Sequence, residues 1–340
     1  MVTINKIRVL VVDDSLLFRE VLSRGISTDP DIEVVAMAVD PYEARDKILK
    51  YKPDVMTCDI EMPKMNGIEF IRRLIPQYPI PVIVVSGVSE AVFEAMGAGA
   101  VDFVAKPDVQ SVIGIKEFLN NLIVKIRIAS KAKIGELYCS NMEGIVKGKN
   151  INADKIIAVG ASTGGTEALY NILKVLPPTA PGIVVVQHMP PVFSKMFADR
   201  LDKQTQLHVK EAQTGDCIEP GKVIIAPGNQ HIKVVTVGKR YVIQFCGVDK
   251  VNGHCPSVDV LFESVARTAG RKAIGVILTG MGYDGAKGLL AMKRKGARTI
   301  GQDEKSSVVY GMPKVAFDIG AVEKQASLEN IPNVIFSMLK

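Results

Sequence analysis

The chain has 340 residues, of which 47% are hydrophobic and 23% charged, and it carries a formal net charge of +6 at pH 7. This length suits two domains, each large enough to bury a core of its own. Lys and Arg are spread along the chain without a dense block, so we expect no nucleic-acid partner.

Five cysteines occur without paired spacing, which excludes a disulfide framework or a zinc site and favours reduced thiols in the cytoplasm. Asp13 and Asp14 precede any long apolar stretch, so the start of the chain does not resemble a signal peptide. The apolar runs are far shorter than the roughly 20 residues needed to span a bilayer. We therefore expect a cytoplasmic protein without membrane insertion.

The first third of the chain alternates short Val- and Ile-rich runs with helical patterns, as buried parallel strands and their connecting helices do. The runs cover residues 9–12, 34–39, 55–58, 82–85 and 101–105. Asp40, Pro41 and Glu43 have the pattern of an N-cap, a first-turn proline and a capping-box acid. Residues 5–126 are predicted to form a doubly wound, flavodoxin-like domain with five parallel strands.

Residues 127–152 are predicted to link the two domains, because Gly, Lys and Asn are common there and no strand signal is clear. The alternation then resumes, and residues 153–340 are predicted to form a second α/β domain. Its expected strands cover residues 156–159, 183–186, 223–226, 274–278 and, more weakly, 298–301. Residues 232–237 and 241–245 flank a Gly-Lys-Arg turn and predict an antiparallel hairpin beside a mostly parallel sheet.

Polar side chains follow the expected strands of the first domain. Asp13 and Asp14 follow the first strand, Asp59 the third, Ser86 the fourth and Lys106 the fifth. Functional groups of open α/β sheets gather at this carboxyl edge. Converging carboxylates need a cation, and oxygen ligands suit Mg²⁺, while a lysine and a hydroxyl suit a phosphoryl group. Any one of these acids alone is explained equally well as a turn former or helix cap.

The segments VVDDS (11–15), CDIEMP (58–63), SG (86–87) and KP (106–107) resemble the response-regulator receiver family. The resemblance implies that Asp59 accepts a phosphoryl group from a histidine kinase. It implies a Mg²⁺ site made by Asp13, Asp14, Asp59 and the main-chain carbonyl of Glu61. It further implies that Ser86 and Lys106 contact the phosphoryl oxygens and that Phe103 is the switch aromatic. The stretch after Ser86 is a few residues shorter than in close relatives.

A second group of polar residues follows the strands of the C-terminal domain. The run 156–159 leads into Gly160-Ala161-Ser162-Thr163-Gly164, the G-x-S-x-G pattern of a nucleophilic serine at a strand-to-helix turn. A phosphate-binding glycine loop or a plain turn would have the same pattern, so Ser162 needs partners elsewhere in the chain.

The chain has four histidines, and His188 is the one that directly follows an expected strand, 183–186. His254, in a loop, is the main alternative as the base. Asp284 follows the strand 274–278, where it could orient an imidazole or simply cap the next helix. Ser162, His188 and Asp284 therefore form a candidate triad, whose chain order differs from that of α/β-hydrolases.

The segments 160–165, 187–190, 256–262 and 278–285 are similar to the chemotaxis protein-glutamate methylesterase (CheB) family. The resemblance implies Ser162 as nucleophile, His188 as base and Asp284 as the group that orients it, with the main-chain N–H of Met281 in the oxyanion hole. Hydrolysis would need no cofactor.

The same resemblance implies an enzyme that removes methyl groups from glutamate esters of methyl-accepting chemotaxis receptors and deamidates receptor glutamines. Phosphorylation of the receiver would control it. Two alternatives stay open: a receptor-binding scaffold with an inactive hydrolase domain, and a transcriptional regulator, although no DNA-binding pattern follows the receiver.

Overall fold

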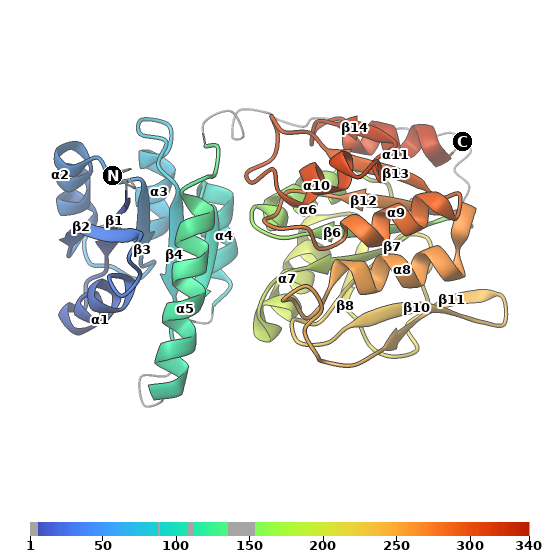
Figure 1. The fold of residues 1–340 in the computed structure, drawn as a ribbon, viewed down its shortest axis with the longest axis horizontal. Helices are drawn as coiled ribbons and strands as arrows, with labels where there is room; N and C mark the ends of the chain where they lie inside the picture. Colours follow the sequence, from blue (N-terminus) through green and yellow to red (C-terminus); the bar gives the residue numbers. More distant parts are fainter. Residues whose placement is uncertain (1–5, 88, 108–111, 135–153, 340) are drawn as a thin grey trace. The chain divides into compact units, whose positions relative to one another are not determined.

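The computed structural model describes residues 6–87, 89–107, 112–134 and 154–339, in two compact units, Met1–Tyr138 and Cys139–Lys340. Figure 1 shows that a sheet flanked by helices forms each unit. Most of the predicted linker, residues 135–152, lies outside the described residues. The helix α5 (Val112–Ala129) runs three residues past the predicted end of the first domain at 126.

The first unit is a sheet of five parallel strands in the order β2-β1-β3-β4-β5, which confirms the predicted doubly wound fold. The strands are β1 (Ile7–Val12), β2 (Ile32–Ala38), β3 (Val55–Cys58), β4 (Val82–Ser86) and β5 (Asp102–Ala105). Besides α5, the helices are α1 (Leu16–Ile26), α2 (Pro41–Tyr51), α3 (Gly67–Leu74) and α4 (Ala91–Ala98). Chain order reverses between β1 and β3, so a crevice for polar groups is expected where these strands end.

Helix α2 begins as its sequence predicts. The Asp40 carboxylate accepts hydrogen bonds from the N–H groups of Tyr42 and Glu43, at 3.0 and 2.9 Å. Glu43 reaches back to accept from the N–H of Val39 at 2.7 Å. The bonds to Asp40 satisfy main-chain donors that the helix itself leaves unpaired and confirm the predicted N-cap, while Glu43 closes the box on Val39, one residue before the N-cap.

The second unit is a sheet of seven strands in the order β14-β13-β12-β6-β7-β9-β8, and every ladder in it is parallel. The strands are β6 (Ile156–Ala161), β7 (Gly182–Gln187), β8 (His208–Glu211), β9 (Lys222–Ile225), β12 (Ala273–Ile277), β13 (Arg298–Gln302) and β14 (Lys324–Ala326). The helices are α6 (Gly165–Leu173), α7 (Pro191–Gln204), α8 (Val258–Thr268), α9 (Ala286–Arg294), α10 (Met312–Asp318) and α11 (Ile331–Leu339), with a 3₁₀ turn at Gly270–Lys272.

The predicted hairpin is confirmed as a separate antiparallel pair, β10 (Ile232–Val237) and β11 (Arg240–Phe245). Helix α8 holds it in place, because Ser264 Oγ accepts from the Val234 N–H at 2.9 Å and Thr268 Oγ1 donates to the Val234 carbonyl at 3.0 Å. Buried Ile243 and Phe262 belong to the core cluster of this unit. Among the described helices, none is both long and apolar enough to cross a bilayer.

Candidate functional sites

Three carboxylates gather at the carboxyl edge of the first sheet. Asp13, Asp14 and Asp59 each offer a carboxylate oxygen, and these oxygens lie within 4.8 Å of one another. Asp13 and Asp59 are 1% and 4% exposed. The Lys106 ammonium pairs with both, 2.8 Å from Asp13 Oδ2 and 2.6 Å from Asp59 Oδ2. The structure thus brings together the acids and the lysine, which were predicted to lie close together because each follows a strand of the sheet.

The electrostatics of this cluster follow from burial and pairing. Burial raises the pKa of Asp13, although the bond from Lys106 opposes this effect. Burial also acts to lower the pKa of Lys106, but its hydrogen bonds to Asp13 and Asp59 outweigh burial and raise the pKa. The ammonium is therefore charged at neutral pH and compensates the acids.

Three more residues were predicted to act in the receiver: Ser86, Phe103 and Glu61. Ser86 is the last residue of β4, and its carbonyl accepts from the Lys106 N–H at 2.7 Å. The buried Phe103 ring in β5 lies edge-on to Phe93 of α4, with 6.1 Å between centroids. Glu61 is exposed, two residues after Asp59. These positions leave the predicted roles of all three residues open.

The donor set of the acid cluster fits Mg²⁺. Asp13, Asp14 and Asp59 supply carboxylate oxygens at a single point, which is the ligand chemistry that a hard divalent ion prefers. Arg19, which the sequence did not single out, donates from Nη1 to the carbonyls of Asp13 at 2.6 Å and Asp14 at 2.9 Å. This guanidinium holds the chain in the turn that presents both acids.

Replacing Lys106 with methionine is expected to destabilise the first unit. The substitution leaves two buried carboxylates side by side without a cation, which should lower the free energy of unfolding by about 3 kcal/mol at neutral pH in a chelating buffer. Thermal or urea unfolding measures the loss. Lys64→Met is a matched control, because Lys64 pairs with Asp40 from a 65% exposed side chain and should lose much less. Equal unfolding midpoints for wild type and Lys106→Met would contradict the expectation.

The second site lies where three neighbouring strands, β12, β6 and β7, end. Ser162 follows β6, with its N–H donating to the Thr279 carbonyl at 3.0 Å and its own carbonyl accepting from the Gly165 N–H at 2.7 Å. The Gln187 amide joins the next strand end, since Nε2 donates to the carbonyls of Ser162 at 2.9 Å and His188 at 3.2 Å. Serine and histidine are therefore held on one edge of the sheet.

His188 is joined to Asp284 and not to any other carboxylate in the described part of the chain. Its Nε2 lies 3.0 Å from Asp284 Oδ2, while its buried Nδ1 has no hydrogen-bond partner among the described residues. An imidazole that donates from Nε2 carries its lone pair on Nδ1, the nitrogen then available to accept a proton from a hydroxyl.

Asp284 is 1% exposed, and its carboxylate accepts hydrogen bonds from four donors besides His188 in the described part of the chain. The other donors are Asn252 Nδ2 at 2.9 Å, Ser257 Oγ at 2.7 Å, and the N–H groups of Val258 at 2.7 Å and Asp259 at 3.3 Å. Burial acts to raise the pKa of Asp284, but the hydrogen bonds from His188, Asn252 and Ser257 outweigh it and hold the pKa well below its usual range. The carboxylate is therefore ionised at neutral pH.

Asp284 does not cap its own helix, which was the structural alternative for this residue. The N-cap of α9 is Gly285, without a side-chain cap bond. Asp284 instead accepts from Val258 and Asp259, the first N–H groups of α8, so the positive end of that helix favours the ionised carboxylate.

The chain beyond β12 lies directly against the turn that carries Ser162. A Cβ added at Gly280 would meet Ser162 Cβ at 2.6 Å, so only glycine allows this approach. The next residue, Met281, is 38% exposed, and its N–H forms no hydrogen bond within the described residues. Met281 is the residue for which the family resemblance implies an oxyanion donor, and that role stays a prediction.

Gln187, Asn252 and Ser257 were not predicted as site residues, yet each donates a hydrogen bond to Ser162 or Asp284. The His254 ring stacks on His188 with 3.8 Å between centroids and 9° between planes. His254 was the alternative base, yet the bond to Asp284 comes from His188. The Asn-Gly pair at 252–253 is a turn signal, which could have drawn attention to this loop.

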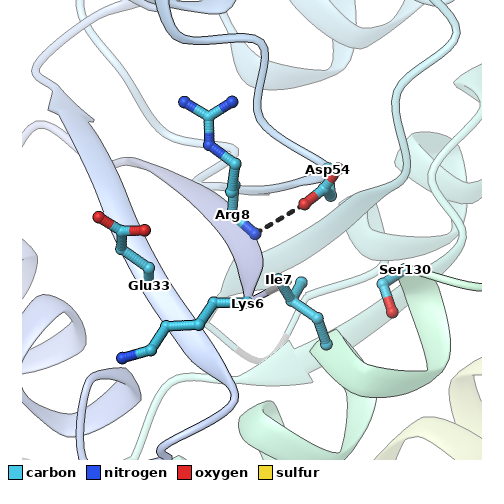
Figure 2. Close-up of a pocket in the computed structure, with 6 residues that line it drawn as sticks. All are labelled: Lys6, Ile7, Arg8, Glu33, Asp54 and Ser130. Atoms are coloured by element: carbon cyan, nitrogen blue, oxygen red, sulfur yellow. Dashed lines mark hydrogen bonds between the residues drawn. The ribbon is translucent and has the colours of Figure 1, made fainter. Parts of the chain in front are cut away.

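A separate hollow of about 560 Å³ lies at the opposite, amino-terminal edge of the first sheet. Figure 2 shows its lining and the hydrogen bond from the Arg8 N–H to Asp54 Oδ2, which spans 2.8 Å. The lining residues are Lys6, Ile7, Arg8, Glu33, Asp54 and Ser130. Since Asp59 lies at the other edge, the hollow is no part of the acid cluster.

Comparison with known proteins gives the same two parts. Residues 9–114 match the response regulator receiver domain and residues 157–335 match the CheB methylesterase family. The chain is 54% identical over 338 residues to "Protein-glutamate methylesterase/protein-glutamine glutaminase 2" of Syntrophomonas wolfei subsp. wolfei, covering 99% of this chain and 98% of that protein. It is 48% identical to a protein-glutamate methylesterase/protein-glutamine glutaminase of Syntrophotalea carbinolica, covering 98% of both.

The solved structures include a similar catalytic domain. The crystal structure of the Thermotoga maritima CheB methylesterase catalytic domain covers 54% of this chain and 98% of its own, with 39% identity and a TM-score of 0.53. The family matches, the sequence identity over almost the whole chain and the folds of the two units all point to one family. This chain belongs to the CheB family of protein-glutamate methylesterases with an N-terminal response-regulator receiver.

Proposed function

We propose that the chain is a phosphorylation-controlled protein-glutamate methylesterase and protein-glutamine glutaminase that acts on methyl-accepting chemotaxis receptors in the cytoplasm. One observation carries the catalytic part of this proposal. Ser162, His188 and Asp284 follow three neighbouring strands, and the ionised Asp284 binds the His188 ring. In a serine hydrolase an acid orients an imidazole, and the imidazole takes the proton from a serine hydroxyl.

Ser162 Oγ attacks the γ-carbonyl of a methylated glutamate, and His188 takes the hydroxyl proton at Nδ1. The C–O bond to the methoxy group then breaks, and the same proton leaves with methanol. Water attacks the resulting ester on Ser162 by the reverse proton path, which releases glutamate and restores the serine. Asp284 stays ionised throughout and stabilises the positive charge on the imidazole.

The oxyanion of each tetrahedral intermediate needs a donor fixed in advance. The Met281 N–H has no competing hydrogen bond among the described residues, and the preceding residue, Gly280, packs against Ser162. One such donor lowers the barrier by about 3 kcal/mol. A glutamine side chain presents the same carbonyl with ammonia as the leaving group, so deamidation follows from the same groups.

In the receiver, Asp59 accepts the phosphoryl group from a histidine kinase, while Ser86 and Lys106 bind the phosphoryl oxygens and Phe103 senses the change. Asp13, Asp14 and Asp59, with the main-chain carbonyl of Glu61, would hold Mg²⁺. The bound ion would offset the negative charge of the incoming group and of the carboxylates. The support is the convergence of the acids with Lys106 at the carboxyl ends of the strands of the first sheet.

Phosphorylation of Asp59 is expected to raise the esterase rate, because receiver and hydrolase lie on one chain. Asp59→Asn removes the carboxylate that accepts the phosphoryl group, so a small-molecule phosphodonor with Mg²⁺ should stimulate wild type and leave the variant at its basal rate. The measurement is methanol release with and without donor. Asp46→Asn, an exposed acid on α2, serves as the control and should respond like wild type. Stimulation of Asp59→Asn would refute the role of this residue.

Methanol release from methylated receptor membranes tests the function itself. Wild type should release methanol and convert receptor glutamines to glutamates. Binding to the membranes without either product would favour the alternative of a scaffold with an inactive hydrolase domain.

A further inference from the structure

A tight turn lies beside the two proposed catalytic partners of Ser162. Val251 and His254 exchange main-chain hydrogen bonds of 2.9 and 3.0 Å, and the two residues between them have positive φ, 54° at Asn252 and 84° at Gly253. Asn-Gly is the preferred pair for such a turn, because both residues tolerate a left-handed backbone. The Asn-Gly sequence therefore specifies the turn that ends at His254.

A second histidine fixes both ends of the segment that carries this turn. His231 is 3% exposed, its Nε2 lies 2.7 Å from the Asp249 carbonyl, and its Nδ1 lies 3.0 Å from the Ser257 nitrogen. One neutral tautomer satisfies both contacts, because Nε2–H donates to the carbonyl and Nδ1 accepts from the N–H. The segment 249–257 is therefore anchored independently of His188.

The His254 ring lies against the face of the His188 ring, with 3.8 Å between centroids and 9° between planes. Burial and the neighbouring His188 lower the pKa of His254 to about 4, so its ring is uncharged at neutral pH. An uncharged, anchored ring can remain stacked when His188 gains a proton during catalysis.

His188 has particular need of such a neighbour. Its hydrogen bond to Asp284 is made by Nε2, which lies nearer than Nδ1 to the extended Cβ–Cγ axis about which the imidazole rotates. Rotation about this axis moves Nε2 less than it moves Nδ1, and the χ2 angle of histidine is broadly distributed. The bond to Asp284 therefore leaves Nδ1, the atom that must face Ser162, less restrained than Nε2.

We propose that His254 is a positioning residue that fixes the plane of the His188 imidazole by face-to-face stacking, so that Nδ1 keeps a fixed direction for the proton transfer from Ser162. This inference rests on the proposed role of His188 as the base. His254 itself transfers no proton in this account, which separates it from the alternative in which His254 is the base.

Substitutions at position 254 distinguish stacking from proton transfer. His254→Ala and His254→Leu remove the flat ring and should lower kcat for methanol release by about 10- to 100-fold, with KM within about threefold of wild type, because the base is misplaced while the substrate still binds. His254→Phe retains a flat ring without a titratable nitrogen and should restore kcat to within about threefold of wild type. Leu fills the volume of the imidazole, so it keeps the comparison valid if the alanine variant fails to fold.

Two results would overturn the proposal: His254→Leu with the kcat of wild type, or a folded His254→Phe as impaired as His254→Leu. His208→Leu, at an exposed histidine paired with Asp202, controls for loss of a histidine elsewhere and should match wild type. Failure of the underlying function is recognised separately, because then wild type releases no methanol or Ser162→Ala releases as much as wild type.

Discussion

Ser162→Ala is expected to lower methanol release from methylated receptors by at least about 10⁴-fold. Alanine cannot form the acyl-enzyme, and neither His188 nor Asp284 can then contribute, since both act through the serine hydroxyl. The remaining activity would come from substrate binding and the oxyanion donor alone. Initial rates of methanol release at saturating receptor measure the loss.

The loss should be specific to the nucleophile. The Ser162 carbonyl and N–H bonds are main-chain contacts that alanine retains, so the unfolding midpoint should change little. Ser337→Ala makes the same substitution at an exposed position of α11 and should keep the wild-type rate. If Ser162→Ala retained more than a few per cent of the wild-type rate, another residue would have to be the nucleophile.

Asp284→Asn is expected to lower kcat by about 10⁴-fold and to destabilise the second unit as well. Every hydrogen bond at Asp284 is donated to it, and an asparagine offers only one acceptor oxygen with an NH₂ group that must face another donor. His188 would lose its partner or bind in the wrong tautomer. Kinetics and urea unfolding measure the two effects.

The pH dependence of this destabilisation has a defined sign. The native pKa of Asp284 lies below its unfolded value, so the ionised carboxylate contributes stability that is present above about pH 4 and is lost as the pH falls. The difference in unfolding free energy between wild type and Asp284→Asn should therefore shrink as the pH drops below about 4. A difference that grew on acidification would contradict the network.

Asp259→Asn is the matched control, because Asp259 is a buried carboxylate in the same cluster that does not bind His188. Burial raises its pKa, with the Gly288 N–H opposing this and the charge of Asp284 adding to it. Its Oδ1 accepts from the Gly288 N–H at 2.6 Å, which an asparagine oxygen can also do, while the bond from Asn252 Nδ2 to Oδ2, at 2.8 Å, is lost in the variant. The variant should keep most of the activity, and a loss equal to that of Asp284→Asn would show that the cluster acts only as structure.

Both folds were predictable because buried parallel strands are continuous apolar runs. The same strand pattern placed Ser162, His188 and Asp284 beyond the ends of β6, β7 and β12. The edge strand β14 was missed because Lys324–Ala326 is a three-residue strand without an apolar run. The edge strand β8, with the sequence HVKE, has no continuous apolar run and is not among the expected strands.

The interactions around the triad were not predictable from local sequence. Asp284 caps α8 instead of its own helix, and His254 stacks on His188, because segments distant in the chain meet at one edge of the sheet. Local sequence patterns do not specify such tertiary contacts. The Asn-Gly signal predicts a turn at 252–253 but does not say which side chains the turn serves.

Covalent capture of the nucleophile tests the central claim most directly. A serine-reactive organophosphonate, incubated with the full-length wild-type protein and followed by peptide mass spectrometry, should give one adduct, on Ser162, at the same rate as esterase activity is lost. Ser162→Ala should give no adduct. Labelling of a different residue, or complete loss of methanol release without an adduct on Ser162, would contradict hydrolysis through this serine.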